Sequence, residues 1–410
     1  VPGRAELVLV SKVGYLQGKN LTMAKTRAET GHPFPEMVEY AEGCWHCIHP
    51  DFLEDQLDRS LARLQVDHLD VYLLHNPEYF LGHAHQTDLP LAHARAEYYR
   101  RLGQAFGWLE AQVSAGRIGA YGISSNSFPG DPDDPEFTSL ESVLAMAREV
   151  SANHHLAVIQ FPGNLFEGGA WLRPNQLEGQ QTVLQLAAAA NLGTLINRPL
   201  NAVVGDHMRR LAGPLTPPTP APDKLQAWLA HLRGLEAKLP EVLEGAPAKI
   251  PKDRLPSLFN LGRQLSESLE SYPDWETWDH VRQNLIESRM NAYLEYLDEK
   301  LAVLPAWEPW SKSYATALRE SLDLISAQYL QGASTRAAVL AQELDEMAPL
   351  LATSDNLAQR ALRVLLGKPT VSSVLLGARQ VPYVQDAVAA LRSPSLPDAS
   401  PIMRRCANML

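Results

Sequence analysis

The sequence predicts an α/β fold of the (β/α)8 barrel type, and three observations lead to this prediction. Short apolar, β-branched runs recur along the chain, helical patterns fall between them, and polar residues follow the runs. Strands that alternate with helices form parallel sheets with right-handed crossovers. Because the runs are short and the polar residues lie in the loops that follow them, a barrel is favoured over an open doubly wound sheet.

The predicted strands are short, apolar and rich in β-branched or aromatic residues. They are residues 7–13, 69–74, 118–124, 157–161, 193–197 and 373–376. Helices are predicted between them, at residues 52–64, 98–115, 140–150, 182–190 and 356–366. In the first of these helices Leu53, Leu57, Leu61 and Leu64 form one apolar stripe, and Asp51 is the expected N-cap.

The alternation stops after the fifth strand. A Pro-rich linker, residues 213–222, leads into a long stretch with helical apolar spacing. A barrel crossover needs only about 10–15 residues, so this stretch is predicted to be an inserted helical unit. The predicted division is residues 1–204 for the first part of the barrel, 205–350 for the insertion, 351–395 for the last helix–strand–helix and 396–410 for a tail.

The composition is that of a globular enzyme and excludes several other classes of protein. A net charge of -11 without a Lys/Arg run argues against a nucleic-acid partner. No apolar stretch is long enough to cross a bilayer, and no signal peptide is present. Three cysteines (Cys44, Cys47 and Cys406) do not indicate a disulfide framework. We therefore expect a cytoplasmic protein without a membrane contact. The chain opens with Val1 and enters a strand almost at once, so we also expect the domain to begin upstream.

Ionisable side chains stand where the first two strands stop being apolar. Lys12 ends the run L-V-L-V-S-K-V, and His75 ends the run H-L-D-V-Y-L-L-H. In a parallel barrel the carboxyl ends of the strands form the rim that holds the active site. A lone lysine there is usually solvated and a lone histidine is often structural. Their joint placement indicates a site that tunes proton affinity at a carbonyl carbon.

Polar side chains also follow the third and fourth strands. Residues 116–127 end in S-S-N-S, whose hydroxyl and amide groups can bind a carboxamide or cap the next helix. Gln160 places a second carboxamide at the end of the following strand.

The last two strands are followed by arginines. Asn197 and Arg198 come after the fifth strand, where the arginine can bind a phosphate or pair with a carboxylate on the rim. After the sixth strand, Gly377 allows close backbone approach and Arg379 adds charge beside a helix N-terminus. The loops after the last barrel strands commonly bind phosphate.

Other motifs are incomplete or absent. Cys44 and Cys47, with His46 and His49 beside them, resemble a metal knuckle, but no second cysteine pair completes a four-ligand zinc site, so no metal is predicted. G-x-G-x-x-G, G-x-x-x-x-G-K-[ST] and G-x-S-x-G do not follow any predicted strand. Rossmann-type, P-loop and serine-hydrolase interpretations are therefore disfavoured.

Several of these segments together resemble the aldo-keto reductase family. They read L-V-S-K-V-G, D-Q-L-D-R-S-L-A-R-L-Q-V-D-H-L-D-V-Y-L-L-H-N-P, G-R-I-G-A-Y-G-I-S-S-N-S, V-I-Q-F-P-G-N-L, L-I-N-R-P-L and A-L-R-V-L-L-G-K-P-T-V-S-S-V-L-L-G-A-R. The resemblance covers residues 8–204 and 356–391, and its most specific part is S-L-x-R-L followed by D-x-x-D-x-Y-L-L-H. It implies a (β/α)8 barrel that binds NADP or NAD extended across the rim.

The family reaction is the reversible reduction of a small-molecule carbonyl by NAD(P)H. A tyrosine supplies the proton, assisted by a lysine, a histidine and an aspartate; a nearby ammonium lowers the pKa of a phenol from its usual value near ~10. By resemblance the catalytic matches are Lys12 and His75. The cofactor-binding matches are Ser125 and Asn126, with Ser124 as the alternative by one residue, and Gln160, Asn197, Arg198, Gly377 and Arg379.

The chain also departs from the family pattern. The family's aspartate and tyrosine lie upstream of the lysine strand, and no residue here matches them. We therefore expect about six of eight βα units, the catalytic pair on a missing N-terminal segment, and a chain inactive alone. Asn197 stands where the family places an aromatic against the nicotinamide. Tyr383 stands where a basic residue often binds the 2′-phosphate, so NADP and NAD both remain open, with Arg379 as a compensating charge.

The function expected from the resemblance is that of an NAD(P)H-dependent aldo-keto reductase. Two alternatives belong to other classes. One is a non-catalytic nucleotide-binding barrel whose helical insertion binds a protein partner. The other is a lyase that forms a Schiff base on Lys12, which borohydride trapping would detect.

Overall fold

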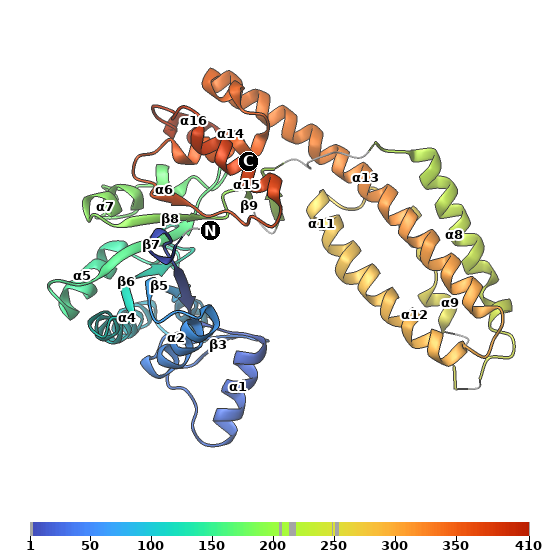
Figure 1. Ribbon diagram of the computed structural model, residues 1–410, viewed down its shortest axis with the longest axis horizontal. Coiled ribbons are helices and arrows are strands. Elements are labelled where there is room, and N and C mark those ends of the chain that lie inside the picture. The colour runs from blue at the N-terminus through green and yellow to red at the C-terminus, as the bar shows by residue number, and fades with distance from the viewer. Residues whose placement is uncertain (1–2, 205–206, 213–218, 248, 251–253, 410) are drawn as a thin grey trace. The chain divides into compact units, whose positions relative to one another are not determined.

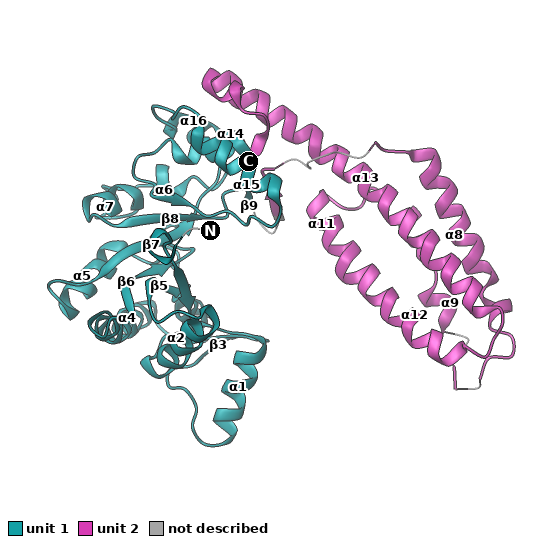
Figure 2. Ribbon diagram, viewed as in Figure 1, with its two compact units in different colours: residues 1–202, 359–410 teal, residues 203–358 magenta. Residues whose placement is uncertain are grey.

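The computed structural model describes residues 3–204, 207–212, 219–247, 249–250 and 254–409. The chain divides into two compact units, residues 1–202 with 359–410 and residues 203–358 (Figure 2). The first unit contains the predicted strands, and the second is an insertion between the fifth and sixth of them.

A parallel sheet of six strands organises the first unit. Its order is β1-β5-β6-β7-β8-β11, and every neighbouring pair is parallel. The strands are β1 (Val10–Val13), β5 (Leu69–His75), β6 (Ile118–Ser124), β7 (Leu156–Pro162), β8 (Gly193–Asn197) and β11 (Ser373–Val374). The strands β1 and β11 form its two edges. The predicted fold, an incomplete (β/α)8 barrel with a helical insertion, is confirmed (Figure 1).

Helices connect the strands as a parallel sheet requires. They are α1 (Gly18–Glu29), α2 (Pro50–Leu64), α3 (Tyr79–Gln86), α4 (Leu91–Ser114), α5 (Leu140–Val150), α6 (Gly169–Leu172), α7 (Val183–Ala189), α14 (Leu357–Leu366), α15 (Val381–Arg392) and α16 (Ser400–Ala407).

In the helix α2 the predicted apolar stripe and the predicted N-cap can be compared with the structure. Leu53 and Leu57 of the predicted stripe are fully buried, whereas Leu64 at the helix end is exposed. The expected N-cap, Asp51, is wrong: His49 is the cap, and its Nδ1 accepts from the backbone N–H of Asp51 at 3.2 Å. Pro50 explains the difference, because proline favours the first position of a helix and moves the cap to the preceding residue.

A small antiparallel sheet between β1 and α2 was not predicted. Its order is β2-β4-β3, from β2 (Tyr15–Leu16), β3 (Val38–Ala41) and β4 (Cys44–His46). Cys47 donates its backbone N–H to the Gly14 carbonyl at 2.9 Å, which ties β4 to the end of β1. The small sheet therefore adds aromatic and histidine side chains next to the predicted rim.

The second unit is mainly helical and has its own core. Two paired strands, β9 (Asn201–Val204) and β10 (His207–Arg210), lie where the chain passes from the first unit into the second. Its helices are α8 (Pro222–Val242), α9 (Leu255–Leu258), α10 (Leu261–Glu267), α11 (Trp275–His280), a π-helical segment (Val281–Glu287), α12 (Ser288–Leu301), α13 (Trp307–Met347) and a 3₁₀ turn (Pro349–Thr353). One hydrophobic cluster joins them and contains Trp278, Trp307, Trp310 and Tyr314. Of the predicted linker, residues 213–218 lie outside the described residues.

Trp278→Ala is expected to destabilise the second unit by about 3–5 kcal/mol. The indole of Trp278 is fully buried and donates from Nε1 to Ser326 Oγ at 2.8 Å, so truncation leaves a cavity and removes one hydrogen bond. Urea unfolding followed by far-ultraviolet circular dichroism measures the loss. Trp228→Ala is the matched control, because Trp228 is only partly buried against the same cluster; equal losses for the two variants would contradict the packing described.

Candidate functional site

Strand register places the predicted residues along one face of the sheet. His75 is the register partner of Ser124, and Ser124 is the register partner of Gln160. On the neighbouring strand Lys12 pairs with Leu73, two residues before His75. Because side chains alternate between the faces of a strand, these four side chains share a face near the carboxyl ends of the strands. The sequence predicts that Lys12, His75 and Gln160 converge with Ser125 and Asn126; strand register brings Ser124, the alternative by one residue, to this face.

Lys12 and His75 have contrasting electrostatics. Lys12 Nζ donates to Ser124 Oγ at 3.4 Å, reaching across the intervening strand. Burial lowers the pKa of Lys12 to about 8. Burial, then the Lys12 charge and the neighbouring His46, lower the pKa of His75 to about 4. At pH 7 the site therefore holds a lysine ammonium beside a neutral imidazole.

His46, in strand β4 of the small sheet, holds the end of β5 through a hydrogen bond. His46 is 1% exposed, and its Nε2 lies 2.7 Å from the carbonyl oxygen of His75. Burial lowers the pKa of His46 to about 4, so it is neutral and donates from Nε2. Gly14 permits this approach: a Cβ there would lie 2.5 Å from His46 Nε2 and 2.6 Å from the His75 oxygen. The ends of β1 and β5 are thereby held together.

A group of aromatic side chains stands beside His75. The Tyr15 ring packs edge-on against the His75 ring, with centroids 4.8 Å apart, and its hydroxyl accepts from Asn76 Nδ2 at 2.7 Å. Tyr79 packs edge-on against Tyr15, and Tyr40 stacks on Tyr79 at 4.1 Å. Sequence reasoning missed these tyrosines. The only signal was Tyr15 itself, three residues after the predicted lysine.

A network of buried hydroxyl groups supports the S-S-N-S loop after β6. Ser125 Oγ and Ser127 Oγ both bond to Thr138 Oγ1, at 3.3 and 3.0 Å, and Tyr98 bonds to the same atom at 3.0 Å. Ser125 is 1% exposed, whereas the neighbouring Asn126 is exposed. The Ser125 hydroxyl is thus engaged within the protein, while Ser124 faces Lys12.

Two buried amide oxygens on this rim lack a hydrogen-bond partner among the described residues. They are Gln160 Oε1 and Asn197 Oδ1. Gln160 is 2% exposed, and Asn197 is the register partner of Pro162, two residues beyond Gln160 on β7. A buried carbonyl oxygen without a donor is costly, so it indicates a ligand that brings an N–H group. The amide of a nicotinamide is such a group, and the residues present fit it.

Arg198 forms an ion pair on the rim. Its guanidinium donates to Glu167 Oε1 at 2.7 Å, and its backbone is in the left-handed region with φ of 54°. Of the two roles left open by the sequence, pairing with a carboxylate is the one present. Gly377 has open space at its Cβ position and Arg379 is exposed, so both are accessible after β11.

Cys44, Cys47 and His49 each bond to a different local partner. Cys47 Sγ lies 3.4 Å from the Pro35 carbonyl, and Cys44 Sγ accepts from Gln17 at 3.2 Å. Both cysteines are free thiols, and His49 serves as the helix cap. Among the residues described, no group of His, Cys, Asp or Glu is arranged to hold a metal ion.

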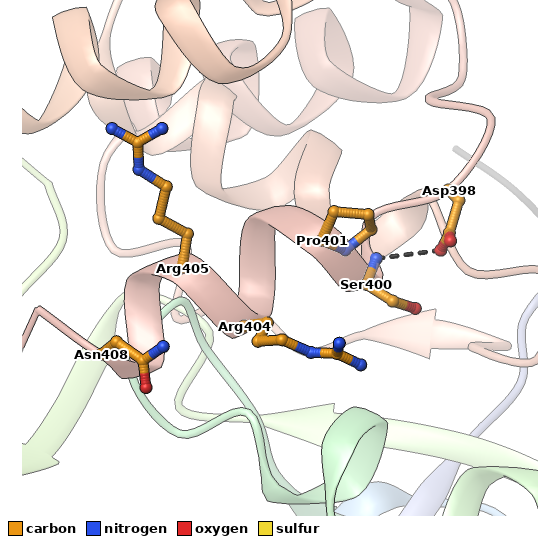
Figure 3. Close-up of a pocket in the computed structure, with 6 residues that line it drawn as sticks. All are labelled: Asp398, Ser400, Pro401, Arg404, Arg405 and Asn408. Carbon is orange, nitrogen blue, oxygen red and sulfur yellow. Dashed lines mark hydrogen bonds between the residues drawn. The ribbon is translucent and has the colours of Figure 1, made fainter.

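A pocket near the C-terminal end contains none of the predicted site residues (Figure 3). It is lined by Asp398, Ser400, Pro401, Arg404, Arg405 and Asn408. Asp398 Oδ1 accepts from the Ser400 backbone N–H at 2.9 Å. The Arg404 and Arg405 side chains point in different directions, so they do not converge on one anion (Figure 3).

Comparison with known proteins finds a family match in the N-terminal part of the chain. Residues 4–131 match the model of the Aldo/keto reductase family. No curated protein matches the chain. Among solved structures, aldo-keto reductase AKR11C1 from Bacillus halodurans, in its holo form, is 14% identical, with a TM-score of 0.40 over 98% of this chain and 74% of that chain. Where the chain is described, no helix has both the length and the apolar character needed to cross a membrane.

Proposed function

We propose, from the match of residues 4–131 to the aldo/keto reductase family, that this chain is part of an oxidoreductase that reduces small-molecule carbonyls with NAD(P)H. The observation that carries the proposal is the shared rim of Lys12, His75, Ser124 and Gln160, which strand register brings to one face. A lysine ammonium, a neutral imidazole and an unpaired carboxamide oxygen suit this reaction.

The cofactor would be NADP or NAD, and it would supply the hydride when bound. Gln160 Oε1 would accept from the carboxamide N–H₂, and Asn126 or Ser124 would donate to its carbonyl. Asn197 occupies the neighbouring strand end with an unpaired Oδ1. The exposed Arg379 beside Gly377 is the candidate for a phosphate of the dinucleotide.

The chain's own residues would act on the carbonyl oxygen. Negative charge develops on that oxygen as hydride arrives, and the Lys12 ammonium stabilises it and the phenolate of a tyrosine donor. His75, neutral and held by His46, would orient the substrate by a hydrogen bond. Tyr15 is a poor proton donor, because burial raises its pKa. The donor tyrosine and its aspartate are proposed to lie on a further segment, as the resemblance implies.

The test has a binding part and a turnover part. Tryptophan fluorescence measures the Kd of NADPH and NADH, and Gln160→Leu is expected to weaken binding by about tenfold, the size of one lost hydrogen bond to a buried amide. Gln342→Leu, which replaces an exposed glutamine on α13 of the second unit, is the control. A panel of small aldehydes then measures NAD(P)H oxidation, expected to be slow unless the tyrosine-bearing segment is supplied. Absence of dinucleotide binding would contradict the proposed function.

The rate of carbonyl reduction is expected to fall as pH rises through about 8. Lys12 is charged below its pKa of about 8 and neutral above it, and only the charged form stabilises developing negative charge. The pH profile of kcat measures this limb. In Lys12→Met the limb is expected to disappear; a limb that persists unchanged in the variant would assign it to another group.

One observation favours a second candidate, a lyase that forms a Schiff base. A lysine pKa near 8 leaves more free amine at neutral pH than an ordinary lysine has. Borohydride treatment in the presence of small aldehydes and ketones separates the two proposals. A stable mass adduct on Lys12 would support the lyase, whereas hydride transfer without an adduct supports the reductase.

A further inference from the structure

Glu78 is a carboxyl group buried directly beneath the loop that follows β6. It lies three residues after His75, at the start of α3, and is 2% exposed. Its Oε1 accepts from the backbone N–H of Asn126 at 2.8 Å. Its other oxygen, Oε2, has no hydrogen-bond partner in the described part of the chain. The structure therefore leaves half of this carboxyl group unsatisfied next to the predicted carboxamide-binding loop.

The groups that face Glu78 do not neutralise a negative charge. They are Tyr15 of β2, Tyr40 of β3, Tyr98 of α4 and Glu136, which precedes α5. The tyrosines are neutral near pH 7, and Glu136 is itself acidic. Burial raises the pKa of Glu78 to about 7, and hydrogen bonds from its own backbone N–H and that of Asn126 only partly oppose this. Both protonation states of this buried group are therefore populated near neutral pH.

We propose that Glu78 distinguishes oxidised from reduced dinucleotide: its ionised form favours the oxidised cofactor, and protonation removes that preference. The oxidised nicotinamide ring is a cation and the reduced ring is neutral. A buried carboxylate without a counter-charge attracts a nearby cation strongly, because the local dielectric is low. This inference rests on the proposed function, which places the nicotinamide against Asn126 and Gln160.

The test compares affinities for the two redox forms of one cofactor. Because the remainder of the dinucleotide is the same in both, the ratio of their Kd values isolates the ring charge. The ratio is measured by tryptophan fluorescence at pH 6 and pH 8 for the wild-type chain and for Glu78→Gln. From pH 6 to pH 8 the ratio of the two Kd values is expected to change in favour of the oxidised cofactor. This change is expected to be about tenfold larger in the wild-type chain than in Glu78→Gln. Lys12 titrates in the same interval but is present in both proteins, so the difference reports Glu78.

Two further variants keep the test decisive. Glu136→Gln removes a neighbouring carboxylate and is expected to keep the wild-type shift. If circular dichroism shows that Glu78→Gln is unfolded, Lys12→Met is measured in its place. In Lys12→Met the ratio of the two Kd values is still expected to shift between pH 6 and pH 8, because Glu78 is present. Equal pH dependence in wild type and Glu78→Gln, or no shift in Lys12→Met, overturns the inference. A wild-type chain that binds neither redox form would instead contradict the proposed function.

Discussion

Lys12→Met is expected to lower the turnover number for carbonyl reduction by about 10²–10³, with a much smaller change in cofactor affinity. Methionine keeps the length and apolar stem of the side chain and removes only the ammonium. The charge acts on a group that becomes negative in the transition state, so its loss raises the barrier more than it weakens ground-state binding. Steady-state kinetics with the tyrosine-bearing segment present, alongside a fluorescence Kd for NADPH, measures both quantities.

Lys19→Met is the matched control for this experiment. Lys19 lies on α1 and is exposed, so its loss is expected to leave turnover within twofold. If Lys12→Met turned over as fast as Lys19→Met, Lys12 would have no part in the chemistry. If instead both affinity and turnover collapsed together, its bond to Ser124 Oγ would be organising the rim rather than stabilising charge.

Gly122→Ala is expected to destabilise the first unit by roughly 3 kcal/mol or more. Gly122 lies in β6, which has a strand on each side. A Cβ at this position would overlap the backbone oxygen of Val158 in β7 and lie 2.8 Å from Leu73 Cδ2 in β5. Backbone in the middle of a sheet cannot move aside without losing ladder hydrogen bonds, so the strain is not relieved locally. Thermal and urea unfolding measure the loss.

Gly107→Ala provides the opposite expectation within the same unit. Gly107 lies in the interior of α4 and is exposed, and a Cβ added to it would have no atom within 4 Å outside its own helix backbone and chain neighbours. Alanine there is expected to stabilise the protein by up to about 1 kcal/mol, because glycine is a poor helix former. Two glycine-to-alanine changes with the same sign would contradict the contrast in packing.

Much of the rim could be predicted because its signal is local. Residues 118–124 and 193–197 are strands with the predicted bounds, since short runs of β-branched and apolar residues are typical of buried parallel strands. Lys12 and His75 then follow from a rule of topology: the carboxyl ends of parallel strands meet at one edge. Predicting their placement does not require their side-chain contacts.

The surroundings of the rim depend on distant pairings and were missed. The strands β2, β3 and β4 are two to four residues long and lack an alternating pattern, so composition does not reveal them. His46 acts through the carbonyl of a residue in another sheet, which no sequence pattern encodes. Glu78 follows a proline after a strand, where glutamate is usually solvated; only the packing of α3 and α4 shows that it is buried.

The position of the helical insertion has a consequence for how the protein folds. The edge strand β11 pairs with β8, and Thr194 bonds to Ser372 across a sequence separation of 178 residues. Closing so long a loop carries an entropic penalty that grows with the logarithm of its length, about 0.6 kcal/mol per doubling. An insertion with its own core folds from local contacts and shortens the effective loop before the edge strand docks. We therefore expect the last strand to dock late, after the insertion has folded.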